Sequence, residues 1–260
     1  MTYSMEALHG LNKTHIEKLE KCDRSLWRNI FDTPSSTPSE SFYFETGEMP
    51  LHLIILSRQF MYYWTLLQKP EKVFLAQREF PVKVDWVSTV RQEMNNSYIT
   101  VSDLEISKLS KNECKTILKN KLRDRCDSYL LELQIKNKKT KMLRLSPNMK
   151  EYLTTELLTV EEKKLLFKLK TRMIDIKCNF KNKYNDLTCI MCGEQDQQET
   201  QQHLMSCQVI TTHPDIKNKV NSIKYNDIYE SLDKHIRAIK VFKRILKLRT
   251  IKAEEMNQEH

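Results

Sequence analysis

Apolar residues recur at intervals of three and four positions along most of the chain, a period typical of amphipathic helices. Pro50 precedes a long apolar run that extends to about Leu67, and Pro70 prevents that helix from continuing. A capping box of Ser110 and Glu113 marks another helix start, because each side chain can satisfy a backbone N–H of the first turn. The predicted helices include 38–46, with Gly47 as its stop, and 50–67, 71–79, 84–94, 110–135, 159–169 and 227–248.

Glycine is scarce in this chain, with three residues among 260. Tight turns and phosphate-binding loops need glycine, so the composition argues against Rossmann folds, P-loops, β-barrels and propellers. Hydrophobic residues make up 40% of the sequence, which is enough for a packed core and too much for general disorder. The sequence therefore predicts a mainly α protein.

A change in amino-acid composition divides the chain into two predicted domains. Residues 134–150 carry six Lys or Arg and no acidic residue, and they end in Ser146-Pro147, which is typical of a linker. We place the boundary near residue 148, with a helical region over 1–148 and a second helical region over 149–260.

The number and spacing of the cysteines and the lengths of the apolar stretches indicate the cellular compartment of the protein. The seven cysteines are an odd number and several are isolated, so they do not form the framework of a small secreted protein. The first residues lack the basic and apolar segments of a signal peptide. The longest apolar stretch, Leu51 to Leu56, is far shorter than a membrane span. We expect an intracellular protein of the nucleus or cytoplasm, neither secreted nor bound to a membrane.

The motif C-x2-C-x10-H-x3-C is the most specific chemical signal in the sequence. Cys189 and Cys192 have the spacing of a metal-binding knuckle, and Gly193 allows the tight turn after them. His203 and Cys207 are four residues apart, so one helical turn presents both on one face. Four such ligands complete a tetrahedral site with no open position, which predicts one structural Zn²⁺ within a module over about 177–210.

The alternative to a metal site is a set of incidental thiols and a surface histidine. Cys178 and His213 lie near the motif and could replace a ligand, although an ordinary buried thiol and a loop histidine explain them more simply. Motifs of P-loop enzymes, serine hydrolases and zinc proteases are absent from the sequence.

Positive charge is concentrated around this module and in the tail. The chain has 43 Lys and Arg against 34 acidic residues, a net charge of +9. Residues 163–183 hold eight cations and one acid, and residues 234–252 hold eight cations and no acid. A solvated amphipathic helix explains any one run, but several runs around a zinc module favour contact with the phosphate backbone of RNA or DNA. The candidate contact residues are Lys181, Lys183, Lys240, Lys243, Arg244 and Lys247.

Three stretches outside the motif also carry a resemblance: Leu11–Leu26, Thr37–Pro50 and the segment containing Asp85-Trp86. Together with the cysteine-rich segment that begins at Cys189, they resemble the region after the polymerase core of LINE-type non-long-terminal-repeat retrotransposon reverse transcriptases. The resemblance implies thumb-like and connecting helices followed by a CCHC zinc module. It also implies that the module grips RNA or DNA and that the polymerase core of the parent element is a partner.

The sequence departs from this family in its catalytic residues. Reverse transcriptases hold two metal ions with palm carboxylates, usually in a motif with paired aspartates, and this chain has no Asp-Asp pair. We therefore expect a fragment of such an element that is not an enzyme.

Three functional hypotheses follow. The first is a non-catalytic, zinc-stabilised nucleic-acid-binding protein derived from a reverse transcriptase. The second is a helical protein–protein interaction scaffold with a structural zinc, and the third is a non-functional element remnant. Salt dependence separates the first two, because binding through several phosphates weakens steeply with salt and an apolar protein interface does not.

Overall fold

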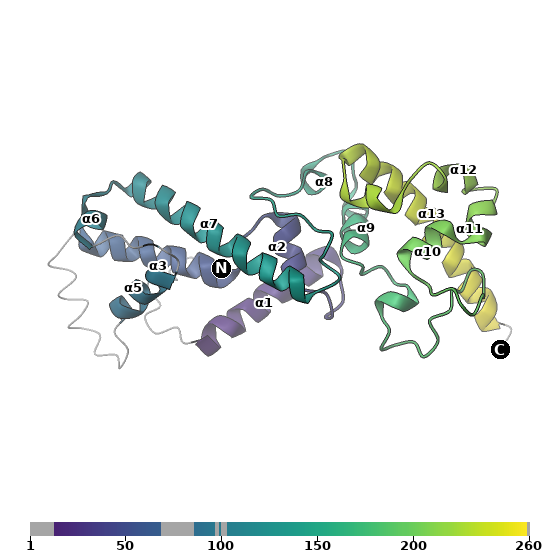
Figure 1. Ribbon diagram of the computed structural model, residues 1–260, viewed down its shortest axis with the longest axis horizontal. Coiled ribbons are helices and arrows are strands. Elements are labelled where there is room, and N and C mark those ends of the chain that lie inside the picture. Colours follow the sequence, from purple (N-terminus) through teal and green to yellow (C-terminus); the bar gives the residue numbers. More distant parts are fainter. Residues whose placement is uncertain (1–12, 69–85, 97–98, 100–102, 259–260) are drawn as a thin grey trace. The chain divides into compact units, whose positions relative to one another are not determined.

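The computed structural model describes residues 13–68, 86–96, 99 and 103–258. The chain is mainly helical, as predicted, and it ends in a long helix (Figure 1). Within the described residues, pairing between extended segments is limited to an isolated antiparallel bridge from Thr188 to Gln198. No helix among them has both the length and the apolar character of a membrane-spanning segment. The predicted helix over 71–79 lies outside the described residues.

The chain forms two compact units that do not follow a single cut in the sequence. The first unit comprises Met1–Trp27 and Glu48–Lys136, and the second comprises Arg28–Gly47 and Asn137–His260. The domain boundary near residue 148 stays a prediction, since compactness alone does not test which segments fold independently.

The first unit is organised around a central apolar helix, α3, which begins after Pro50 and ends at Leu67 as the sequence predicts. This helix packs against α5 (Trp86–Asn96), α6 (Asp103–Lys108) and α7 (Lys111–Lys136). The capping box at the start of α7 is formed, because Ser110 N donates to Glu113 Oε2 at 2.8 Å and Glu113 N donates to Ser110 Oγ at 3.3 Å. The described helices of this unit are α3 (Leu51–Leu67), α5 (Trp86–Asn96), α6 (Asp103–Lys108), α7 (Lys111–Lys136) and the greater part of α1 (Lys13–Phe31), whose last residues from Arg28 belong to the second unit.

One face of α7 is buried, and its buried side chains recur at a regular interval. The members of this stripe are four residues apart, so neighbours in the stripe lie on one face and the stripe winds around the helix by about 40° at each step. Burial raises the pKa of the Cys126 thiol to about 11, so this cysteine is a core residue and not a nucleophile at neutral pH. The stripe consists of Cys114, Leu118, Leu122, Cys126 and Leu130.

The second unit contains a short buried helix, α2 (Glu40–Thr46), which ends at Gly47 as predicted. Gly47 has a φ of 72°, and a Cβ built there would lie 2.6 Å from the carbonyl carbon of Asn148. Glycine is therefore required at position 47 both by its backbone angle and by the close approach of Asn148. Elsewhere on α2, the ring of Phe42 stacks on Phe167, with the ring centroids 5.4 Å apart.

The segment over 137–150 is not the free linker that its composition predicts. The side-chain amide of Asn137 donates to the Glu40 carboxylate at 3.0 Å, and Lys150 N donates to Glu45 O at 2.9 Å. Thr140 is fully buried. The segment packs as part of the second unit because α2 supplies partners for its polar groups.

The tail helix starts and ends later than the sequence predicts. Asp227 caps a separate 3-10 turn by accepting a hydrogen bond from Lys224 N at 2.8 Å, so the long helix begins only at Leu232. No Gly or Pro follows residue 248, and the helix continues to Gln258. The remaining elements of this unit are α8 (Glu151–Thr154), α9 (Val160–Lys170), η2 (Lys177–Asn179), α10 (Gln201–Ser206), α11 (Gln208–Thr212), α12 (Lys217–Val220), η3 (Tyr225–Tyr229) and α13 (Leu232–Gln258).

Candidate metal centre

A two-stranded turn positions the first two cysteines of the motif. Cys189 N donates to Gln197 O, and Glu199 N donates to Leu187 O, both at 2.8 Å, on either side of the single β-bridge. Gly193 N then donates to Cys189 O at 2.9 Å and closes a tight turn. Gly193 has a φ of 67°, the left-handed conformation that glycine adopts most easily. The prediction that Gly193 allows the tight turn after the two cysteines is therefore confirmed.

The helix α10 positions the other two members. The side chain of Thr200 caps this helix by accepting a hydrogen bond from His203 N at 3.0 Å. Cys207 ends the helix, with its N–H donating to His203 O. One helical turn therefore presents His203 and Cys207 together, as their spacing predicts.

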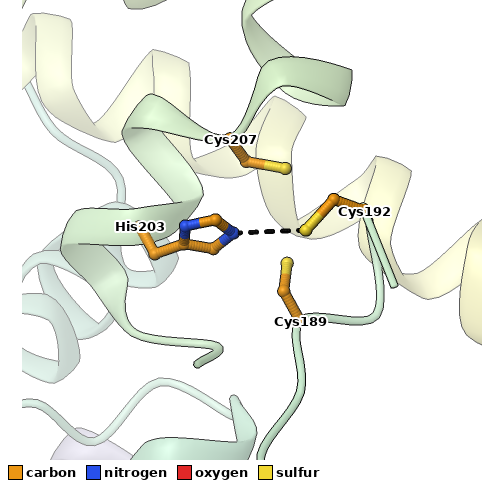
Figure 2. A group of neighbouring side chains, drawn as sticks. All are labelled: Cys189, Cys192, His203 and Cys207. Atoms are coloured by element: carbon orange, nitrogen blue, oxygen red, sulfur yellow. Dashed lines mark hydrogen bonds between the residues drawn. The ribbon is translucent and has the colours of Figure 1, made fainter. Parts of the chain in front are cut away.

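The structure brings all four side chains to one point (Figure 2). Their ligand atoms lie within 4.8 Å of one another, and Cys192 Sγ lies 3.5 Å from His203 Nε2. A tetrahedral zinc site with Zn–S near 2.3 Å and Zn–N near 2.0–2.1 Å has a sulfur-to-nitrogen edge of about 3.6 Å. The donor atoms thus have the identity of a zinc site, the Cys192–His203 distance matches one tetrahedral edge, and the group can hold a metal ion.

The thiols of the centre can ionise together only in the presence of a compensating cation. Burial raises the pKa of Cys189 to about 12, although the backbone N–H groups of Cys192 and Met191 favour its thiolate. Burial also raises the pKa of Cys207, against the N–H groups of Ile210 and Val209. Three thiols around one point cannot all be charged without a compensating cation, and a bound metal ion supplies that charge and displaces their protons.

The two nearby candidate ligands lie outside this group. Cys178 Sγ contacts Gln198 Oε1 at 3.8 Å, and His213 Nδ1 accepts a hydrogen bond from Asp215 N at 3.3 Å. Neither residue belongs to the set of ligand atoms that meet at the centre.

Glu199 is a structural residue of the centre that the sequence does not reveal. Its carboxylate is fully buried and accepts two hydrogen bonds from Arg249 of α13, at 3.0 and 2.9 Å. It also accepts a hydrogen bond from Lys177 N at 2.8 Å. This bidentate pair fastens the metal module to the tail helix, so Arg249 is not one of the solvated cations that the tail composition predicts.

The candidate nucleic-acid contacts divide into different environments. Lys183 is exposed and lies 5.1 Å from the centre of the Phe180 ring, a cation–π distance. Lys181 is exposed and lines a pocket. Lys243 donates to Glu162 at 2.8 Å, so part of its charge is already compensated.

The other three candidates form a stripe on α13. Lys240, Arg244 and Lys247 are exposed, and at 100° per residue they span about 60° of the helix circumference. In the part of the chain that the structure describes, no carboxylate lies within ion-pair distance of these three side chains. We call these residues the tail stripe.

Comparison with known proteins finds no protein-family model, no curated protein and no solved structure that matches this chain. The chemistry of the centre therefore rests on its own donor set and geometry.

Proposed function

We propose that this chain is a non-catalytic nucleic-acid-binding protein whose C-terminal half is held together by one structural Zn²⁺. The observation that carries the proposal is the convergence of Cys189, Cys192, His203 and Cys207 beside a tail helix with uncompensated cations. Zinc prefers sulfur and nitrogen donors, and four of them leave no position for a substrate or for water. The ion would fix the geometry of the module and take no part in a reaction.

The tail stripe provides the contact with nucleic acid in this proposal. Lys240, Arg244 and Lys247 follow one face of a rigid helix, with a rise of about 1.5 Å per residue, and can reach successive phosphates. The opposite face of α13 is buried by residues such as Phe242 and Ile245, so the stripe is held toward solvent.

We also propose that the chain derives from a LINE-type reverse transcriptase and acts with the polymerase core of the parent element. The resemblance of Thr37–Pro50 and of the Cys189–Cys207 motif to that family supports this origin. Sequencing the genomic locus tests it: an adjacent reading frame with the paired aspartates of a palm domain supports the origin, and an unrelated neighbourhood contradicts it.

The binding function is tested by fluorescence anisotropy with labelled single-stranded RNA and DNA over a series of salt concentrations. The test variant replaces Lys240, Arg244 and Lys247 by Gln. A matched control replaces three exposed lysines of the first unit, Lys21, Lys121 and Lys136, by Gln. Each phosphate contact contributes about 0.7 to the logarithmic salt slope for a single strand, so loss of the stripe should reduce the slope by about two and the control should leave it unchanged.

Two results would contradict the binding proposal. One is equal affinity and equal salt slope for the wild type and the tail-stripe variant. The other is zinc-loaded wild-type protein that binds neither probe, which would favour the scaffold hypothesis. Polymerase and nuclease assays with Mg²⁺ test the non-catalytic part, and turnover by the wild type would refute it.

A further inference from the structure

A polar pocket of about 310 Å³ lies in the second unit, against the metal module but separate from the four metal ligands. Its volume is at the lower end of the range for small-ligand sites. Gln198 and Thr200 line it from the segment between the two ligand pairs, and Tyr225 lines it from η3. Three cations also line it: Lys139, Arg172 and Lys181.

The charge in this pocket is of one sign. None of the described residues that line it is an aspartate or a glutamate. The pKa of Lys139 is lowered by its burial and by the positive charge of Arg172, which shows that the two cations lie close enough to repel. Like charges held together without a counterion in a concave site attract an anion.

Arg172 occupies a backbone position that normally favours glycine. Its φ is 56°, and it follows the C-cap of α9 in a Schellman motif, in which Met173 N donates to Lys168 O at 2.7 Å and Arg172 N donates to Leu169 O at 3.3 Å. A left-handed conformation is unfavourable for arginine and easy for glycine. The strain is confined to a position that directs a cationic side chain into the pocket wall, and such strain is common at binding sites.

Gln201 anchors the pocket wall to the end of α9. It is only 3% exposed, and its Nε2 donates to Leu169 O at 3.0 Å. Arg172 follows the same end of α9, so the wall that carries this cation is held in place by a buried hydrogen bond.

We propose that this pocket binds one phosphate group of a nucleic-acid strand, with the oxygens held by Lys139, Arg172 and Lys181. The inference rests on the proposed function and adds to it a defined phosphate site, since the tail stripe lies on α13 and contributes no residue to the pocket.

The decisive variant is Arg172→Gly, because it removes the cation while it supplies the residue that the left-handed position favours. We expect its melting temperature to stay close to that of the wild type, because relief of the left-handed strain offsets the loss of the hydrogen bonds from Arg172 to Tyr225 and Tyr229. Its affinity for a labelled single-stranded RNA or DNA should fall roughly tenfold or more, as expected for the loss of charge-assisted hydrogen bonds. The logarithmic salt slope should fall by about 0.7, the contribution of one phosphate contact. Wild-type affinity in this variant would overturn the proposal.

A second pair of variants provides a test that does not depend on the backbone of Arg172. Lys139→Gln and Lys138→Gln remove the same charge from adjacent residues, but only Lys139 lines the pocket. Affinity should fall in the first variant and not in the second. Equal losses in both would mean that general charge, and not the pocket, is responsible.

Inorganic phosphate serves as a direct probe that is independent of the tail stripe. In ¹⁵N correlation spectra of the full chain, phosphate should shift the amide signals of Thr200 and Gln201 in the wild type and not in Arg172→Gly. If these shifts occur but no strand binds, the pocket is a phosphate site and the proposed nucleic-acid function is wrong. If strands bind through the tail stripe while phosphate leaves both signals unchanged, the pocket proposal is wrong and the function stands.

Discussion

The ion pair between Glu199 and Arg249 makes a strong prediction about how the metal module is held. Arg249 is 8% exposed and Glu199 is fully buried, and two hydrogen bonds join them. Arg249→Met preserves most of the apolar volume of the side chain but leaves the carboxylate buried without its partner. Removal of one member of a buried pair costs about 3–5 kcal/mol, more than any solvent-exposed pair contributes.

This loss is large enough to measure by thermal unfolding of the zinc-loaded protein, followed by circular dichroism. For a chain of this size, about 3–5 kcal/mol corresponds to a melting temperature roughly 6–20 °C lower. The matched control is Lys252→Met, since Lys252 pairs with Glu255 at 3.4 Å on the exposed surface of the same helix. The control should change the free energy of unfolding by less than about 1 kcal/mol.

The double variant Glu199→Gln with Arg249→Met separates the cost of an unpaired charge from the cost of lost packing. Because no uncompensated carboxylate remains, the double variant should be more stable than Arg249→Met alone. The reasoning is refuted if Arg249→Met unfolds within about 1 kcal/mol of the wild type, or if the double variant shows the simple sum of the two single losses.

Three further perturbations test other parts of the structure. Gly47→Ala should cost more than about 3 kcal/mol in denaturant unfolding, through a steric clash added to left-handed strain, whereas Gly193→Ala, with open space at its Cβ position, should cost about 1 kcal/mol. Burial and the nearby charge of Lys170 lower the pKa of His235 from 6.5 to about 4, so the unfolded state binds the proton first. Stability should therefore decrease as the pH falls from about 6.5 to about 4, by about 3 kcal/mol in total, and His235→Gln should flatten that pH profile. Cys192→Ser should lose the metal and the ordered structure of residues 177–210, because metal binding and folding are coupled there.

Each of these has a clear contrary outcome. Equal losses for the two glycine variants would mean that the close approach at Gly47 has no energetic weight. An unchanged pH profile in His235→Gln would assign the acid sensitivity to another group. A Cys192→Ser protein with wild-type helicity and wild-type melting would remove the metal from the account of folding.

The fold could be predicted from the sequence wherever the signals are local. Capping boxes, prolines and Gly47 set the limits of α2, α3 and α7. The sequence predicts too early a start for the tail helix because Asp227 caps a 3-10 turn. A carboxylate at that position is equally compatible with the start of a 3-10 turn and the start of an α-helix. The basic composition of 137–150 predicts a linker, and only the distant partners on α2 show that it is packed.

The four metal ligands were predictable because their spacing is itself the signal. Glu199 and Arg172 were not, since one belongs to a run of polar residues and the other to a run of cations, and nothing local distinguishes them from their neighbours. Their importance arises from contacts over long sequence distances, such as that between Glu199 and Arg249, which lie 50 residues apart.

The most direct test of the central claim is the metal content of the purified 260-residue chain, measured by elemental analysis against protein concentration. The convergence of Cys189, Cys192, His203 and Cys207 predicts one zinc per chain, released by a chelator together with loss of structure in the C-terminal half. Folded, soluble protein that contains no zinc and takes up none from solution would contradict the account.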